Sequence, residues 1–287
     1  MSAKRIGIIG GSGFYKFKGL TVRDTIDMET PFGGPSDALV LGELAGREVL
    51  FLPRHGTGHR LLPSEIPFRA NIYGLKKLGV EWIISVSAVG SMKETIHPCD
   101  VVVPDQLIDR SRTRQDTFFG SGIVAHISFA DPVCPVLSSA LATAAESCGA
   151  RVHRGGTYLC IEGPAFSTRA ESQLYRSWGV DVIGMTNYQE AKLAREAEIC
   201  YTIMACVTDY DCWHETEEAV SVEMLVSNLQ KNASLAQRTI QEALPMIPER
   251  RTCLCANALK DTILTPADRI PQETRRALDV IIGKYVK

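Results

Sequence analysis

The amino-acid sequence predicts a single α/β domain in which helices flank a central mixed β-sheet, and three observations support this prediction. Short runs rich in β-branched residues recur along the chain, and helical patterns lie between several of them. No internal repeat, low-complexity tract or long polar linker divides the chain. Sheets of this kind bind ligands where strands end and loops begin.

The expected strands are short and apolar, as buried strands are. They cover Arg5 to Ile9, Val49 to Leu52, Trp82 to Val86, Val101 to Val103, Val180 to Ile183 and Tyr201 to Val207. The clearest helix runs from about Val222 to Leu244, where apolar residues at steps of three and four form one buried stripe. A shorter helical pattern covers residues 133–144 and is closed by Gly149. We expect a last helix at Gln272 to Tyr285, within a C-terminal extension at about 245–287.

Composition and charge favour a small-molecule ligand. The 287 residues are 45% hydrophobic and 22% charged, with a net charge of -2, so the chain is globular and has no overall basic character for nucleic acid or an anionic membrane. Residues 1–13 fit neither a signal peptide nor a membrane span, and we expect a cytoplasmic protein. The nine cysteines are expected to be reduced; Cys253 and Cys255 are interpreted as two free thiols rather than a redox clip, without an assigned function.

A glycine-rich segment at residues 7–13, GIIGGSG, follows the first expected strand. Its glycines allow several backbone N–H groups to converge on an anion, and Ser12 adds a hydroxyl donor. A tight turn after a strand is the alternative. The spacing differs from the dinucleotide fingerprint G-x-G-x-x-G, so an NAD-dependent oxidoreductase is disfavoured.

Two further strand ends carry candidate phosphate ligands. Arg54 and His55 follow the second strand, and a guanidinium beside an imidazole offers donors for phosphate oxygens, although a surface arginine and a turn histidine explain them better when the segment is taken in isolation. Residues 85–91 are small, with hydroxyl groups, and let a ligand approach the backbone. A plain buried strand fits that segment as well.

The segment at residues 162–172 combines a helix start with a candidate ligand contact. Thr168 and Glu171 have the spacing of a capping box, which predicts a helix that begins there. Capping does not explain the preceding residues, among which Phe166 offers an aromatic face at the lip of a pocket.

Two acidic residues, Asp209 and Asp211, follow the last expected strand. If the chain stays extended, both face the same way, and two carboxyl groups on one ligand raise the pKa of at least one of them. The alternative is an Asx turn or a helix cap. A metal site with His214 and the glutamates after it is disfavoured, because no recognised ligand spacing is met, and no metal is expected.

In their order along the chain, these segments resemble the 5′-methylthioadenosine phosphorylase family, in the trimeric branch of the purine nucleoside phosphorylase superfamily. The motifs are GIIGGSG at 7–13, PRHG at 53–56, SAVGS at 87–91, IEGPAFSTRAES at 161–172, GMTN at 184–187 and TDYDCWHETEEAVSV at 208–222. The resemblance extends to about Leu244. It implies a nucleoside phosphorylase-like fold with one domain over residues 1–287.

The resemblance also implies roles for individual residues. Those that would hold phosphate are Ser12, Arg54, His55, Ser87, Ala88 and Thr186. Those that would surround the nucleoside are Phe166, Ser167, Ile183, Met185, Val220, Val222 and Leu225, with His126 supplied by a neighbouring subunit. Asp209 and Asp211 would be the catalytic groups and would meet N7 and the amino group of adenine. A homotrimer is therefore expected.

The implied reaction is phosphorolysis of 5′-methylthioadenosine to adenine and 5-methylthioribose 1-phosphate, in purine and methionine salvage. Inorganic phosphate is then a co-substrate, and no cofactor is expected. A carboxylate accepts the amino hydrogen of adenine, whereas 6-oxopurines are better met by an amide. Three positions depart from the familiar pattern: Gly184 replaces asparagine, Val89 replaces cysteine, and Gln189 replaces proline before Glu190. Other 6-aminopurine nucleosides therefore remain candidate secondary substrates.

Three classes of alternative stay open at this stage. The chain could be a 6-oxopurine nucleoside or methylthioinosine phosphorylase, a hydrolytic nucleosidase, or a nucleoside-binding protein without turnover. Phosphate dependence and release of free base distinguish them.

Overall fold

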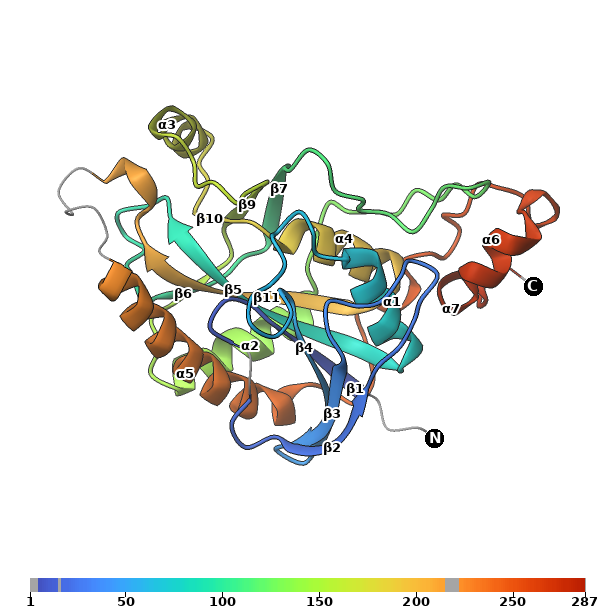
Figure 1. Ribbon diagram of the computed structural model, residues 1–287, viewed down its shortest axis with the longest axis horizontal. Coiled ribbons are helices and arrows are strands. Elements are labelled where there is room, and N and C mark those ends of the chain that lie inside the picture. The colour runs from blue at the N-terminus through green and yellow to red at the C-terminus, as the bar shows by residue number, and fades with distance from the viewer. Residues whose placement is uncertain (1–4, 15–16, 215–221, 287) are drawn as a thin grey trace.

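A computed structural model describes residues 5–14, 17–214 and 222–286, and its strands form one mixed sheet through the middle of the molecule (Figure 1). The strands are β1 (Arg5–Gly10), β2 (Thr21–Ile26), β3 (Leu39–Leu44), β4 (Arg47–Pro53), β5 (Val80–Ser91), β6 (Val101–Val103), β7 (Gln106–Arg110), β8 (Val152–Arg154), β9 (Thr157–Ile161), β10 (Val182–Gly184) and β11 (Cys200–Asp209).

Strand β5 is the centre of the sheet. The main path runs β2-β3-β4-β1-β5-β10-β9-β7, and β11, β6 and β8 form a branch that starts from β5. Strands β4, β1, β5 and β11 are neighbours and run parallel, whereas β10 is antiparallel to β5. The carboxyl ends of four parallel strands therefore meet at one edge of the sheet.

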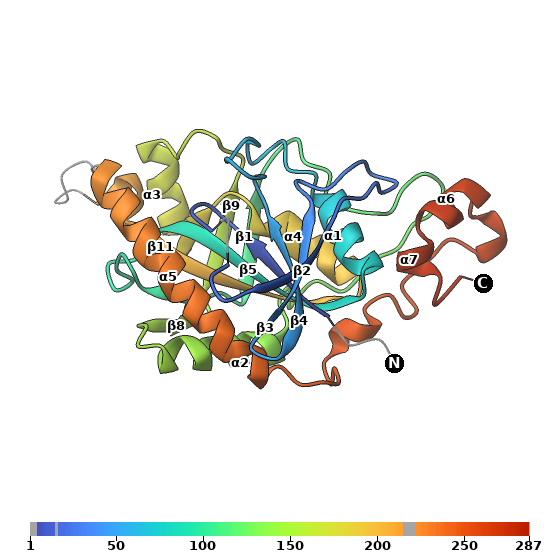
Figure 2. The same ribbon diagram turned by 60° about the horizontal axis from the view of Figure 1, so that its bottom comes forward.

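Helices cover both faces of the sheet. They are α1 (Phe68–Lys77), α2 (Pro135–Ser147), α3 (Arg169–Ser177), α4 (Asn187–Glu196), α5 (Val222–Met246), α6 (Gln272–Ala277) and α7 (Asp279–Ile282), with short 3-10 helices at Asp211–Trp213, Leu254–Asn257 and Ala267–Arg269. Helices α1 and α4 lie on one face, and α2 and α5 lie on the other (Figures 1 and 2). This arrangement confirms the predicted α/β class with a mixed sheet between helices.

The period-two pattern of the central strands builds two separate cores. In β11, Tyr201 and Ile203 pack in the core under α1 and α4, whereas Cys200 and Met204 pack in the core under α2 and α5. Successive side chains of a strand point to opposite faces, so a strand buried on both sides must be apolar throughout. This explains why β11 reads as a continuous apolar run.

Most of the predicted elements are present, with shifted ends. Each expected strand is found, and the expected long helix is α5. The predicted capping box is confirmed: the Thr168 hydroxyl accepts from the backbone N–H of Glu171, and the Glu171 carboxylate accepts from the backbone N–H of Thr168.

The prediction of one continuous last helix from Gln272 to Tyr285 is wrong, because the structure has two short helices there. The helix is interrupted at Leu278, where φ is -100° and ψ is 8°, and resumes as α7. Leu278 is buried at the interruption. Beyond it, Ile281 and Ile282 of α7 pack into the core beside α1.

None of the helices within residues 5–14, 17–214 and 222–286 combines the length and the apolar character that a membrane span requires.

Candidate active site

A cavity of about 380 Å³ lies at the edge of the sheet where the parallel strands end. The predicted site residues that line it are Ser12, Arg54, His55, Ser87, Ala88, Phe166, Ser167, Ile183, Met185, Thr186, Asp209 and Asp211. They come from the ends of β1, β4, β5, β10 and β11 and from the loop before α3. Segments as far apart in the sequence as Ser12 and Leu229 thus share one pocket of nucleoside-compatible size.

The glycine-rich segment brings the backbone of the β1 loop against Arg54. Strand β1 ends at Gly10, whose carbonyl accepts from the Arg54 backbone N–H at 2.9 Å. A Cβ on Gly11 would lie 2.6 Å from the Val86 carbonyl oxygen and 2.9 Å from the Arg54 Nη1 atom. A side chain at residue 11 would therefore displace the loop, so glycine there is a packing requirement of the pocket.

Arg54 is a buried cation held by a buried anion. Its side chain is 1% exposed and forms an ion pair with Glu190, which comes from α4. The guanidinium also donates to the Ser85 hydroxyl and, at 3.1 Å, to the Val86 carbonyl. The Glu190 charge raises the pKa of Arg54 against the opposing effect of burial, so the guanidinium keeps its charge next to the cavity.

His55 is a neutral imidazole at neutral pH. Burial is the main cause that lowers its pKa to about 4, and the neighbouring Arg54 charge acts in the same direction. Its Nδ1 donates to the Leu61 carbonyl at 2.9 Å, because a carbonyl can only accept. In the neutral ring, Nε2 is therefore an acceptor.

The two aspartates line one cavity, but the chain between them is not extended. Strand β11 ends at Asp209, and Asp211 begins a 3-10 helix with φ of 54°. The backbone N–H of Asp211 donates to Asp209 Oδ1 at 2.8 Å, which is the Asx turn that the sequence left open as an alternative. After the turn, Trp213 is buried, and its indole N–H donates to the Ser91 carbonyl at 2.7 Å.

The electrostatics of this pair agree with the prediction of a raised pKa. Burial raises the pKa of Asp211, and the nearby Asp209 charge adds to that effect, while the hydrogen bond from the Ser172 hydroxyl at 2.6 Å opposes it. Both oxygens of Asp209 accept hydrogen bonds, from Asp211 N–H and from the Thr208 hydroxyl at 2.6 Å.

The opposite wall is aromatic and polar. The Phe166 side chain is 77% exposed although it lines the cavity, so it stands at the rim. The buried Ser167 hydroxyl has no hydrogen-bond partner within the part of the chain that the structure describes. A buried polar atom without a partner at a cavity wall is suited to a ligand contact.

Several lining residues were not predicted from the sequence. They are His59, Arg60, Leu61, Leu62, Pro63, Pro164 and Leu229. Leu229 belongs to the apolar stripe of the predicted long helix. The residues from His59 to Pro63 belong to the loop after His55. His59 and Arg60 carry functional groups but lie outside the sequence motifs, whereas the others are apolar residues that only their proximity to the cavity identifies.

Some predicted contacts lie outside what the structure describes. Val220 is not among the described residues, and neither are the side chains of Val222 and Leu225 at the start of α5. His126 is exposed and does not line the cavity of this subunit; its backbone N–H donates to the Thr262 carbonyl at 3.0 Å. These roles stay predictions.

The mixed sheet, the cavity at its parallel strand ends, and the cation and carboxyl groups that line this cavity define a phosphorylase-type α/β protein. A model of the phosphorylase superfamily matches residues 5–245. Curated relatives named S-methyl-5′-thioadenosine phosphorylase include one from Geobacter sulfurreducens, 60% identical over 98% of this chain and 99% of the relative. Another, from Thermosynechococcus vestitus, is 57% identical over the whole of both chains.

Solved structures agree with these sequence relatives. A methylthioadenosine phosphorylase from an antarctic soil metagenomic library superposes with a TM-score of 0.93 at 51% identity, covering 98% of this chain and 99% of that one. The methylthioadenosine phosphorylase of Schistosoma mansoni in complex with adenine gives 0.84 at 36% identity, covering 90% and 96%. The chain belongs to the S-methyl-5′-thioadenosine phosphorylase family of this superfamily. The members of this family are pentosyltransferases of the purine nucleoside phosphorylase type.

Proposed function

We propose that this protein cleaves 5′-methylthioadenosine with inorganic phosphate, producing adenine and 5-methylthioribose 1-phosphate for purine and methionine salvage. The observation that carries the proposal is a single cavity with Arg54 on one wall and Asp209 on another. Breaking an N-glycosidic bond places positive charge on the ribose and negative charge on the purine. A pocket with an anion beside the ribose and a carboxyl group beside the base stabilises both charges.

Phosphate is proposed to bind between the β1 loop, Arg54, His55, Ser87 and Thr186. The Arg54 guanidinium is fixed by Glu190 and supplies positive charge in a buried position. Because neutral His55 presents Nε2 as an acceptor, we expect it to bind a protonated phosphate oxygen rather than a bare one. Helix α4 begins next to Thr186, so its positive end adds to the attraction.

The purine is proposed to bind between Phe166 and the two aspartates. In this arrangement a protonated or hydrogen-bonding carboxyl group at Asp209 stabilises N7 of the departing base, as a general acid does. The Asp211 carboxylate accepts from the amino group of adenine. The Ser167 hydroxyl, which has no partner within the described chain, supplies a further donor.

The working enzyme is proposed to be a cytoplasmic homotrimer without a catalytic metal or organic cofactor. In the trimer, His126 of a neighbouring subunit completes the 5′ pocket together with Val220, Val222 and Leu225. Phe166 at the rim of the cavity and His126 outside the cavity are both exposed in the single chain, so each is accessible to a neighbouring subunit. Light scattering on the purified protein tests the stoichiometry.

One assay tests the reaction. The purified protein is incubated with methylthioadenosine, adenosine and inosine, each with and without phosphate, and free base is followed by chromatography. We expect adenine from methylthioadenosine only when phosphate is present. Release without phosphate would identify a hydrolase, preference for inosine a 6-oxopurine phosphorylase, and binding without release a nucleoside-binding protein.

A further inference from the structure

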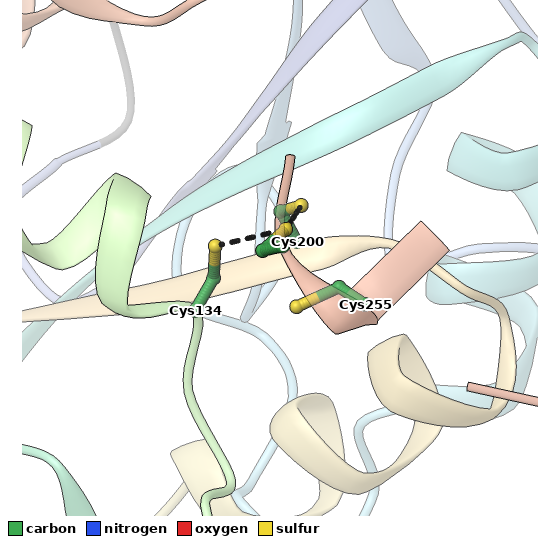
Figure 3. Close-up of side chains that lie close together, drawn as sticks. Cys134, Cys200 and Cys255 are labelled. Carbon is green, nitrogen blue, oxygen red and sulfur yellow. Dashed lines mark hydrogen bonds between the residues drawn. The ribbon is translucent and has the colours of Figure 1, made fainter. Parts of the chain in front are cut away.

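Four cysteines that are far apart in the sequence meet on the opposite side of the sheet from α1 and α4. Cys134 precedes α2, Cys200 begins β11, and Cys253 and Cys255 belong to the short 3-10 helix region after α5. Their Sγ atoms all lie within 4.8 Å of one another. Figure 3 shows the side chains of Cys134, Cys200 and Cys255 with their sulfur atoms directed toward a common point.

The sulfur spacing fits a single tetrahedral metal ion. The Sγ atom of Cys253 lies 3.3 Å from that of Cys200 and 3.6 Å from that of Cys134. A disulfide requires about 2.05 Å. Four thiolates bound to one Zn²⁺ at about 2.3 Å lie about 3.8 Å apart, so only a small contraction or expansion of the cluster is needed.

Four cysteine sulfurs form a ligand set that suits a soft divalent cation such as Zn²⁺.

Access and anchoring are present as well. Cys134 and Cys200 are fully buried, and the Cys134 backbone N–H donates to the Tyr201 carbonyl at 2.8 Å, which fixes these two ligands relative to each other. Cys253 and Cys255 border a second cavity of about 980 Å³, through which an ion reaches the cluster. The active-site cavity is lined by none of these four residues.

We propose that Cys134, Cys200, Cys253 and Cys255 form a structural Zn²⁺ site. Binding converts the four cysteine thiols into metal-bound thiolates, and the thiol protons pass to solvent. The ion ties the segment after α5 to β11 and to the start of α2, three parts of the chain that are far apart in the sequence. The sequence predicts Cys253 and Cys255 as two unassigned thiols; the fold gives them two partners.

The test measures metal directly. The full chain is purified under reducing conditions without a chelator, and its zinc content is quantified by elemental mass spectrometry. We expect about one equivalent per chain, and replacement by Co²⁺ is expected to produce the intense absorption of a tetrahedral thiolate complex. Removal of zinc with a strong chelator is expected to lower the melting temperature, and added Zn²⁺ to restore it.

Variants assign the ligands. Cys253→Ser and Cys255→Ser are expected to lose the bound zinc and the Co²⁺ spectrum. Cys148→Ser is the matched control, because Cys148 lies at the end of α2 outside the cluster, and it is expected to keep both. All three variants are compared by circular dichroism, so that loss of metal is separated from loss of fold.

Two results would overturn the proposal. The first is a folded, fully reduced chain that binds neither Zn²⁺ nor Co²⁺ after reconstitution. The second is zinc content that Cys253→Ser and Cys255→Ser leave unchanged. If the isolated chain contains disulfides among these cysteines, it is reduced and reconstituted before the same criterion is applied.

Discussion

A Cβ atom on Gly184 would lie 2.1 Å from the hydroxyl oxygen of Tyr158 and 2.6 Å from the ring carbon that bears it. Non-bonded heavy atoms do not approach so closely, so glycine at 184 and tyrosine at 158 fit as a pair. Tyr158 is fully buried, and its hydroxyl accepts from the Thr186 backbone N–H at 3.5 Å. Asparagine is the residue that the family resemblance leads one to expect at 184, and the tyrosine excludes it.

We therefore expect the cost of Gly184→Ala to depend on Tyr158. In the native background the added methyl group forces the ring to move, and the free energy of unfolding falls by about 1–3 kcal/mol. In a Tyr158→Ala background the same change costs clearly less, because the obstructing atoms are gone. Urea unfolding of the four proteins measures the coupling. Gly34→Ala, where the nearest atom would lie at 3.4 Å, is the control, and equal costs in both backgrounds would contradict the pairing.

Glu190→Gln tests whether Glu190 positions Arg54. The substitution leaves a buried guanidinium without its counter-charge, so we expect a loss of about 3 kcal/mol in the free energy of unfolding. Because Arg54 lines the proposed phosphate site, KM for phosphate is expected to rise more than KM for the nucleoside.

Glu146→Gln is the matched control for this substitution. Its partner Arg154 lies with it on the surface, so neither stability nor KM is expected to change. A Glu190→Gln enzyme with native KM for phosphate would show that the ion pair serves the fold alone.

The fold was predictable where burial on both faces leaves a continuous apolar run. Strands β1, β5 and β11 have that pattern, and the sequence indicates each of them. Strand β2 was missed because its residues Thr21–Ile26 are almost entirely exposed. Edge strands owe their structure to a neighbour, here β3, rather than to their own periodicity.

The site was predictable where a motif combines several chemical groups, and less so where contacts depend on the fold. Arg54 and Asp209 stand out by type and by position after a strand. Glu190 carries no local signal for its ion pair, because its partner is 136 residues away. The four-cysteine cluster was missed for the same reason: its ligands follow no recognised spacing, and only the topology of α2, β11 and the C-terminal segment brings them together.

His55 and Glu196 are expected to give opposite pH dependences of stability. The folded pKa of His55 is about 4 against 6.5 in its ordinary state, so the unfolded chain takes up a proton first and stability is lost as the pH falls from 6.5 to 4. Burial raises the pKa of Glu196 from 4.5 to about 7, so the unfolded chain releases its proton first and stability is lost as the pH rises between those values.

Variants at the two positions separate these contributions. Relative to the native protein, the free energy of unfolding of His55→Gln should decrease as the pH rises from 4.5 to 6.5, whereas that of Glu196→Gln should increase. Urea titrations in phosphate-free buffer measure both, since bound phosphate would itself stabilise the fold. Parallel slopes for the two variants would contradict the assignment of either group.

Asp209→Asn tests the recognition of the base. The substitution replaces the carboxyl group proposed at N7 by an amide, which cannot act as an acid toward N7 but whose NH₂ group can also donate to the neighbouring oxygen at position six of a 6-oxopurine. We expect kcat/KM for methylthioadenosine to fall by about 10²–10⁴-fold, while activity toward inosine rises relative to it. Release of free base from both nucleosides is the measurement.

The same substitution also changes a residue of the Asx turn between Asp209 and Asp211. The control must therefore separate an effect on this turn from an effect on the base contact. Asp209 accepts from the Asp211 backbone N–H and from the Thr208 hydroxyl; an asparagine keeps the first bond through its oxygen and reverses the second, because its NH₂ group donates to the Thr208 hydroxyl while that hydroxyl donates to the Val89 carbonyl. A loss of activity is attributed to the base contact only if the melting temperature stays near native and Asp268→Asn, an exposed change far from the cavity, stays fully active. If a folded Asp209→Asn enzyme cleaves both nucleosides at native rates, Asp209 does not contact the base.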